Sequence, residues 1–284
     1  MKIGATLIPL VGWGLDVDDV EGARQTHLRA VRRLVQEFGV AAVELNGDFS
    51  TLYPNVFEST YYEQVARLQE ELGFACTVHL PFLWLDGLSL AEPVRRASVE
   101  CVVRAMDWTR PLVVESYVLH LWGIWSSLMV SVQQMPLQER QRLLEAMLRQ
   151  AQATLGEVGD LVANHKLCVE NLEHFPFEEI SALIERQEMR VCLDVGHLTV
   201  SGGDAVDFVS RHWDMIGEIH LHDALPDGVG EPGVRDHLAL GRGAVDYVLF
   251  LDRLREGGYD KVVILEVNTE VDLVESIERV KPWL

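Results

Sequence analysis

Eight short apolar segments alternate with longer amphipathic segments along the 284 residues of the chain. The short segments are rich in Val and Ile, as parallel strands buried on both faces are. We expect strands over residues 2–7, 41–45, 75–80, 116–121, 166–171, 190–195, 216–221 and 261–267. Helices are expected over residues 20–38, 61–72, 93–108, 136–158, 177–186, 204–213, 245–255 and 272–280. Eight such units predict one closed (β/α)8 barrel over residues 1–284 rather than an open sheet.

The composition excludes several classes of protein. With 48% hydrophobic residues, the chain can bury a sizeable core, yet no apolar run approaches the roughly 18 residues of a membrane helix. The first ten residues suit a strand better than a signal peptide. A formal charge of −20 makes nucleic acid an unlikely partner, because duplex binding rests on Lys and Arg. The four cysteines form no CxxC pair, which indicates free, buried thiols in a reduced cytoplasm.

A polar residue stands near the carboxyl end of six predicted strands. These residues are His79, His120, Glu170, Asp194, His220 and Glu266. The carboxyl ends of barrel strands face the active site, so the six side chains are expected at one mouth. Buried carboxylates need a countercharge, and the strand ends carry no Lys or Arg. A divalent metal meets that need, and mixed His, Asp and Glu ligands suit Zn²⁺, Mn²⁺, Co²⁺ or Fe²⁺ better than Ca²⁺, with Mg²⁺ also open.

Other interpretations of single residues stay open. One His or Asp at a strand end is more often a hydrogen-bonded structural residue, although six at the same end are poorly explained that way. His222 shares a strand face with His220, so alternation along the strand leaves either one as the ligand. Trp122 can line a substrate pocket or simply pack. Arg235 can meet an anionic group or lie in solvent.

Seven motifs together resemble the xylose isomerase-like barrel superfamily. They are VHLPF, LHLW, VENL, LDVGH, HLHD, DH-x3-G-x-G and ILEV, in that order. That superfamily includes sugar isomerases and epimerases, inosose dehydratases and apurinic endonucleases of the endonuclease IV type. The resemblance implies a metal site made of Glu170, Asp194, His220 and Glu266. It also implies that Glu170 and Glu266 exchange a proton with the carbon next to a carbonyl. His197 would bind substrate hydroxyl groups, with Asn171 and His222 as further candidates.

The likeness to endonuclease IV adds two further metal positions. His79 and His120 would hold a second metal that shares Glu170, and His197 with His237 would hold a third. That family has an Asp two residues before the position of His237, where this chain has Arg235. Asp236 is adjacent but is expected to point elsewhere, which weakens the case for three metals and for phosphodiester hydrolysis.

The preferred hypothesis is therefore a metal-dependent isomerase or epimerase of a small sugar or polyol. The alternatives are a zinc-dependent phosphodiesterase, a lyase, and a metal-binding barrel without catalytic activity. Related barrels often associate, which makes a homodimer a candidate assembly.

Overall fold

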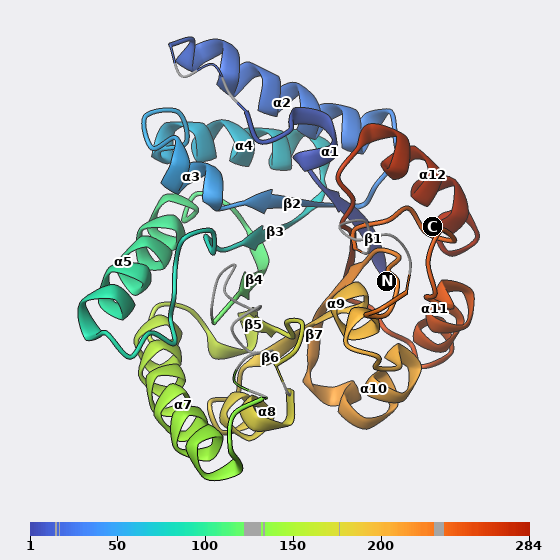
Figure 1. Cartoon of the computed structure of the whole chain (residues 1–284). Coiled ribbons are helices and arrows are strands. Elements are labelled where there is room, and N and C mark those ends of the chain that lie inside the picture. Colours follow the sequence, from blue (N-terminus) through green and yellow to red (C-terminus); the bar gives the residue numbers. More distant parts are fainter. Residues whose placement is uncertain (15, 17, 122–131, 133, 176, 230–235) are drawn as a thin grey trace.

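The structure is a computed structural model of the chain (Figure 1). It describes residues 1–284 with the exception of 15, 17, 122–131, 133, 176 and 230–235. Two residues named as substrate-binding candidates, Trp122 and Arg235, lie outside the described residues.

Eight parallel strands close into a barrel, each paired with its neighbours in chain order and β8 paired with β1. They are β1 (Lys2–Thr6), β2 (Ala42–Asn46), β3 (Ala75–His79), β4 (Val114–Leu119), β5 (Leu167–Glu170), β6 (Arg190–Asp194), β7 (Ile216–Leu221) and β8 (Val262–Leu265). Helices surround the strands as an outer ring (Figure 1). The prediction of a single (β/α)8 barrel is confirmed.

The described helices are α1 (Ile8–Val11), α2 (Val20–Gln36), α3 (Asp48–Leu52), α4 (Ser59–Leu72), α5 (Glu92–Trp108), α7 (Leu137–Gly159), α8 (Phe177–Arg186), α9 (Val195–Val200), α10 (Ala205–His212), α11 (Tyr247–Glu256) and α12 (Glu270–Val280). In the part of the chain that the structure describes, none of them is long and apolar enough to cross a membrane.

Local sequence signals explain where the long helices begin and end. The Asp19 side chain accepts a hydrogen bond from the backbone N–H of Gly22 and so caps α2. Asp204 and Asp246 cap α10 and α11 in the same way. Gly73 ends α4 with a φ of 72°, a left-handed conformation that glycine adopts without steric cost.

Three short helices were not predicted, and one strand is displaced. The helices α1, α3 and α9 follow β1, β2 and β6 directly, and they are too short to show a helical period in the sequence. The fourth strand begins at Val114 rather than at residue 116, and it ends one residue before His120. One of these short helices, α9, carries His197, and its N-cap is Asp194.

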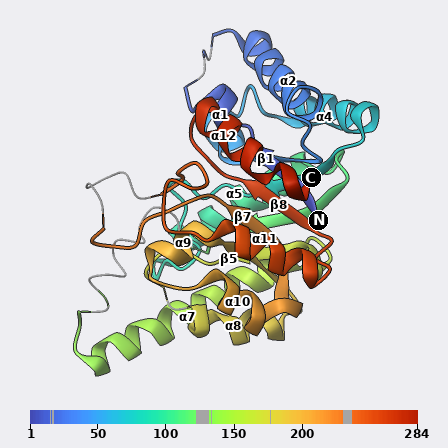
Figure 2. The ribbon, with the colours of Figure 1, turned by 90° about the vertical axis from the view of Figure 1, so that its right-hand side faces the viewer.

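The interior of the barrel is separate from the core between strands and helices. Val118, Cys168 and Cys192 form one small buried cluster, and Ala42, Val262 and Ile264 form another. Glu170 and Asp194 lie two residues beyond Cys168 and Cys192, so their side chains share the inward face. Figure 2 views the barrel from the side, with both termini at one end.

Candidate metal centre

The six predicted strand-end residues meet at one mouth of the barrel. His79, Glu170 and Asp194 are the last residues of their strands, and His220 lies one residue before the end of β7. His120 and Glu266 each follow the last residue of a strand. Five of the six side chains are at least nine-tenths buried, and that of Glu266 is 21% exposed.

Three carboxylates converge on one ring nitrogen of His220. Its Nδ1 lies 2.9 Å from Glu266 Oε2, 3.6 Å from Glu170 Oε2 and 3.8 Å from Asp194 Oδ2. This nitrogen is buried and makes no well-directed hydrogen bond, even to Glu266 Oε2 at 2.9 Å. A buried nitrogen without a partner, surrounded by carboxylate oxygens, fits a divalent cation whose ligands are all four residues.

Glu44, which sequence reasoning missed, lies behind His220. Its Oε2 is 3.3 Å from Nε2 of His220 and 3.3 Å from the Thr77 hydroxyl. A carboxylate there accepts a hydrogen bond from the Nε2–H group and leaves the Nδ1 lone pair directed at the other carboxylates. The available signal was a charged residue between the apolar residues Val43 and Leu45 of strand β2.

A second group of ligands surrounds Glu170. Its Oε2 lies 2.9 Å from His120 Nε2 and 3.3 Å from His79 Nε2, and its Oε1 lies 3.3 Å from His197 Nδ1. His79, His120 and Glu170 offer ligand atoms close enough to share one metal ion.

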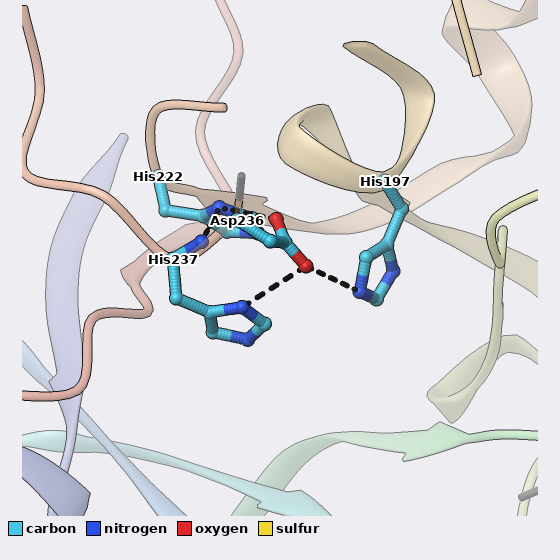
Figure 3. A group of neighbouring side chains, drawn as sticks. All are labelled: His197, His222, Asp236 and His237. Atoms are coloured by element: carbon cyan, nitrogen blue, oxygen red, sulfur yellow. Dashed lines mark hydrogen bonds and ion pairs between the residues drawn. The ribbon is translucent and has the colours of Figure 1, made fainter. Parts of the chain in front are cut away.

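A third group joins His197, His222, Asp236 and His237 (Figure 3). Asp236 Oδ2 lies 3.1 Å from His237 Nδ1 and 3.7 Å from His197 Nε2. The expectation that Asp236 points elsewhere is therefore wrong. It assumed an extended backbone, whereas His237 has a φ of 55°, and this left-handed turn brings both neighbours to the site.

Asn171, a predicted substrate-binding residue, is buried and bonded on both sides of its amide. Its Nδ2 donates to the carbonyl oxygen of Asp194, and its Oδ1 accepts from the Asp194 N–H, at 2.9 and 2.8 Å. Through these two hydrogen bonds, Asn171 links the carboxyl ends of β5 and β6.

Protons and carboxylates balance one another in this cluster. Burial would raise the pKa of Glu170, but the charges of His120 and His220 hold it well below its usual range. Burial alone would lower the pKa of His79, but the neighbouring carboxylate of Glu170 outweighs it and raises that pKa to about 9. A divalent metal entering such a cluster would displace the proton of His79.

A cavity of about 70 Å³ opens beside the cluster. Glu266, His79 and His237 line it together with Trp13, Phe82, Asn46, Asn268, Thr6, Ile8, Glu44 and Val267. A larger hollow of about 770 Å³ lies at the opposite end of the barrel, next to Lys2 and Glu115, and contains none of the cluster.

Comparisons with known proteins agree with this architecture. The family model of the xylose isomerase-like TIM barrel matches residues 32–283. An uncharacterized protein of Methanocaldococcus jannaschii is 26% identical over 250 residues, covering 81% of this chain and 78% of that protein. An inosose dehydratase of Lacticaseibacillus casei is 25% identical over 105 residues, covering 33% of this chain and 35% of the enzyme.

Two solved structures illustrate the likeness in fold. A D-tagatose 3-epimerase-like protein has a TM-score of 0.74 at 22% identity and covers 100% of this chain and 97% of its own. An AP endonuclease of family 2 from Brucella melitensis has a TM-score of 0.65 at 16% identity, covering 99% and 98%. The fold and the ligand groups define an α/β barrel with a candidate metal centre at the carboxyl ends of its strands. The chain belongs to the xylose isomerase-like TIM barrel family.

Proposed function

We propose that the protein is a divalent-metal-dependent enzyme that isomerises or epimerises a small sugar or polyol by proton transfer next to a carbonyl. The observation that carries the proposal is the convergence of Glu170, Asp194 and Glu266 on the unpartnered Nδ1 of His220. These four residues would hold the metal, with Mn²⁺, Co²⁺, Zn²⁺, Fe²⁺ and Mg²⁺ as candidates. When bound, the metal would polarise the substrate carbonyl.

The two glutamates differ in what they can do to a substrate proton. Glu266 is partly exposed and lines the cavity, so a bound substrate can reach it. Glu170 is buried, and both of its oxygens lie against imidazole rings, so a substrate has less access to it than to Glu266. We therefore assign Glu266 the removal of a proton from one face of the substrate. Glu170, in its protonated form, would deliver a different proton to the other face.

The cavity favours a small polyhydroxylated substrate. Asn46 and Asn268 provide side-chain amides, while Trp13 and Phe82 provide aromatic surface. A few polar groups among apolar ones are typical of a small-molecule site. The names of an epimerase-like protein and of an inosose dehydratase among the similar proteins support this class of substrate.

A second candidate is metal-dependent hydrolysis of a phosphoester. It is favoured by the ligand groups around Glu170 and Asp236, which offer positions for more than one metal ion. Adjacent metal ions can stabilise both the attacking and the leaving oxygen of a phosphoester. The position of Asp236 removes the geometric objection to a third metal, while the charge of −20 still opposes a nucleic acid substrate.

Metal content and isotope exchange test the two candidates together. Elemental analysis of protein purified without chelator would compare wild type, Glu170→Ala and, as a matched control, the exposed Glu185→Ala of α8. The metal-loaded protein would then be incubated with a panel of ketoses in deuterated water, and with an abasic-site duplex at low salt.

One metal per chain, lost only in Glu170→Ala, and deuterium at the carbon next to the carbonyl would support the isomerase. Two or more Zn²⁺ with strand cleavage would support the hydrolase instead. Loss of water from a polyol without isomerisation would indicate a lyase. A chain that takes up no metal under any loading condition would refute both candidates.

A further inference from the structure

We propose that His222 is a positioning residue that joins the metal ligand Asp194 to the loop carrying Asp236 and His237. The proposal rests on the proposed function, because it concerns the same site. The proposal also explains why position 196 is a glycine: a side chain there would occupy the space of the His222 ring.

The contacts of the His222 ring determine which nitrogen carries the proton. The backbone N–H of His237 points at Nδ1 from 3.0 Å. An amide N–H can only donate, so Nδ1 presents a lone pair and the ring proton lies on Nε2. Nε2 is 3.1 Å from both carboxylate oxygens of Asp194, to which it donates. The carbonyl oxygen of Asp223 and Asp236 Oδ1 lie farther from Nδ1, at 3.3 and 3.2 Å.

His222 and His220 are therefore in different states although they are two residues apart on one face. The ring of His222 is fully buried, and both of its nitrogens have protein partners. His220 keeps an unpartnered Nδ1 directed at three carboxylates. This difference assigns the metal to His220 and leaves His222 to orient the carboxylate that binds it.

Gly196 shows that the position of the His222 ring is built into α9. A Cβ atom on Gly196 would lie 1.8 Å from Cε1 and 2.3 Å from Nδ1 of His222. Every other residue type carries that atom, so the ring and a side chain cannot share the space. The glycine of LDVGH, on α9, and the second histidine of HLHD, just after β7, thus pack as one unit.

The contacts couple the loop to the metal ligand. Asp194 Oδ1 also accepts the N–H of His197 at 2.6 Å, so α9 and His222 hold the carboxylate from two sides. The loop is paired to the end of β7 through reciprocal backbone hydrogen bonds between Asp223 and Leu238, each 2.9 Å. A shift of Asp236 and His237 would therefore act on Asp194 through the His222 ring.

Two substitutions separate the two contacts of His222. In His222→Asn, the side-chain oxygen replaces Nδ1, but the side chain is too short to reach Asp194. In His222→Gln, the side-chain nitrogen replaces Nε2, and nothing replaces Nδ1. Two readouts are needed: Zn²⁺ affinity by competition with a chromophoric chelator, and hydrogen exchange of the His237 amide by NMR.

We expect His222→Asn to keep slow exchange of the His237 amide and to bind Zn²⁺ about 10- to 100-fold more weakly, the usual cost of losing a group that orients a ligand. His222→Gln should show the reverse, with near wild-type affinity and a rapidly exchanging amide. If both variants match wild type in both readouts, or if both readouts change together in each variant, the proposal is overturned. If wild type binds no Zn²⁺, the proposed function fails, while amide exchange still tests the link to the loop.

Substitutions at Gly196 provide an independent test of the packing argument. Gly196→Ala should lower the melting temperature, and Gly196→Ala with His222→Ala should recover most of the loss because the second change vacates the space. A single Gly196→Ala variant as stable as wild type, with its His237 amide still protected, would overturn the packing argument.

Discussion

Glu218 is a carboxyl group inside the barrel, and its replacement by Gln should stabilise the metal-free protein at high pH. The side chain is fully buried on β7, and its Oε2 accepts a 2.6 Å hydrogen bond from the Ser116 hydroxyl. Burial, and next the carboxylate of Glu44, raise the pKa of Glu218 to about 8. The group is therefore neutral at pH 7, and Gln has nearly the same shape as the neutral acid.

The sign follows from proton binding in the two states. Below the unfolded pKa of about 4.5, both states carry the proton and the group costs nothing. As the pH rises towards 8, the unfolded chain releases the proton while the folded protein keeps it, so the free energy of unfolding falls. The change from 4.5 to about 8, at 1.36 kcal/mol per pKa unit, sets an upper bound of about 5 kcal/mol on this loss. Structural relaxation reduces it, and we expect about 2–4 kcal/mol.

Urea unfolding at pH 5, 7 and 9 in the presence of chelator measures the effect. Glu218→Gln should exceed wild type least at pH 5, which is just above the unfolded pKa, and by increasing amounts at pH 7 and 9. The exposed Glu185→Gln serves as the control and should follow wild type at each pH. Parallel curves for Glu218→Gln and wild type across the whole range would refute the reasoning, because they would mean that folding leaves the ionisation of Glu218 unchanged.

Glu44→Gln should weaken Zn²⁺ binding about 10- to 100-fold with little change in melting temperature, because it removes the carboxylate behind His220. Competition with a chelator measures the affinity, and an unchanged value would show that Glu44 does not orient His220. Zn²⁺ affinity should rise between pH 6 and 9, because a metal bound by Glu170 would displace the proton that this carboxylate holds on His79, whose pKa is about 9. A flat profile in the same competition assay would contradict this. Asp223→Asn should lower the free energy of unfolding, measured in urea, by about 1–3 kcal/mol. The Asp223 carboxylate accepts hydrogen bonds from the N–H groups of Ala224, Gly241 and Val245, and an amide would leave one of them unpaired. An unchanged unfolding midpoint would argue against this role.

The architecture could be predicted because its signals are local. Each strand is a short Val- and Ile-rich run, each long helix has a three- to four-residue period, and eight repeats of that unit leave few arrangements other than a barrel. Alternation along a strand puts Glu170 on the same face as Cys168, and the fold packs Cys168 in a small buried cluster with Val118 and Cys192. The short helix α9 gave no such signal, because six residues do not complete two helical turns.

Within the candidate site, the positions of residues on strands could be predicted from the sequence, whereas those of residues on loops could not. Residues on strands, such as Asp194 and His220, could be brought together from the order of the strands alone. Asp236 could not, because the positive φ of His237 breaks the alternation on which the prediction depended. Glu44 was overlooked because one charged residue in an apolar strand does not reveal what faces it across the barrel.

The sequence by itself determined the barrel, the end of it at which the candidate ligands lie, and the residue types gathered there, since these depend on periods and spacings along one chain. Only the tertiary structure decided which ring nitrogen of His220 faces the carboxylates, that His222 is held by Asp194 and His237, and that Gly196 must lack a side chain. Each of these depends on the separation and direction of atoms from different strands, which close packing sets and no local pattern records.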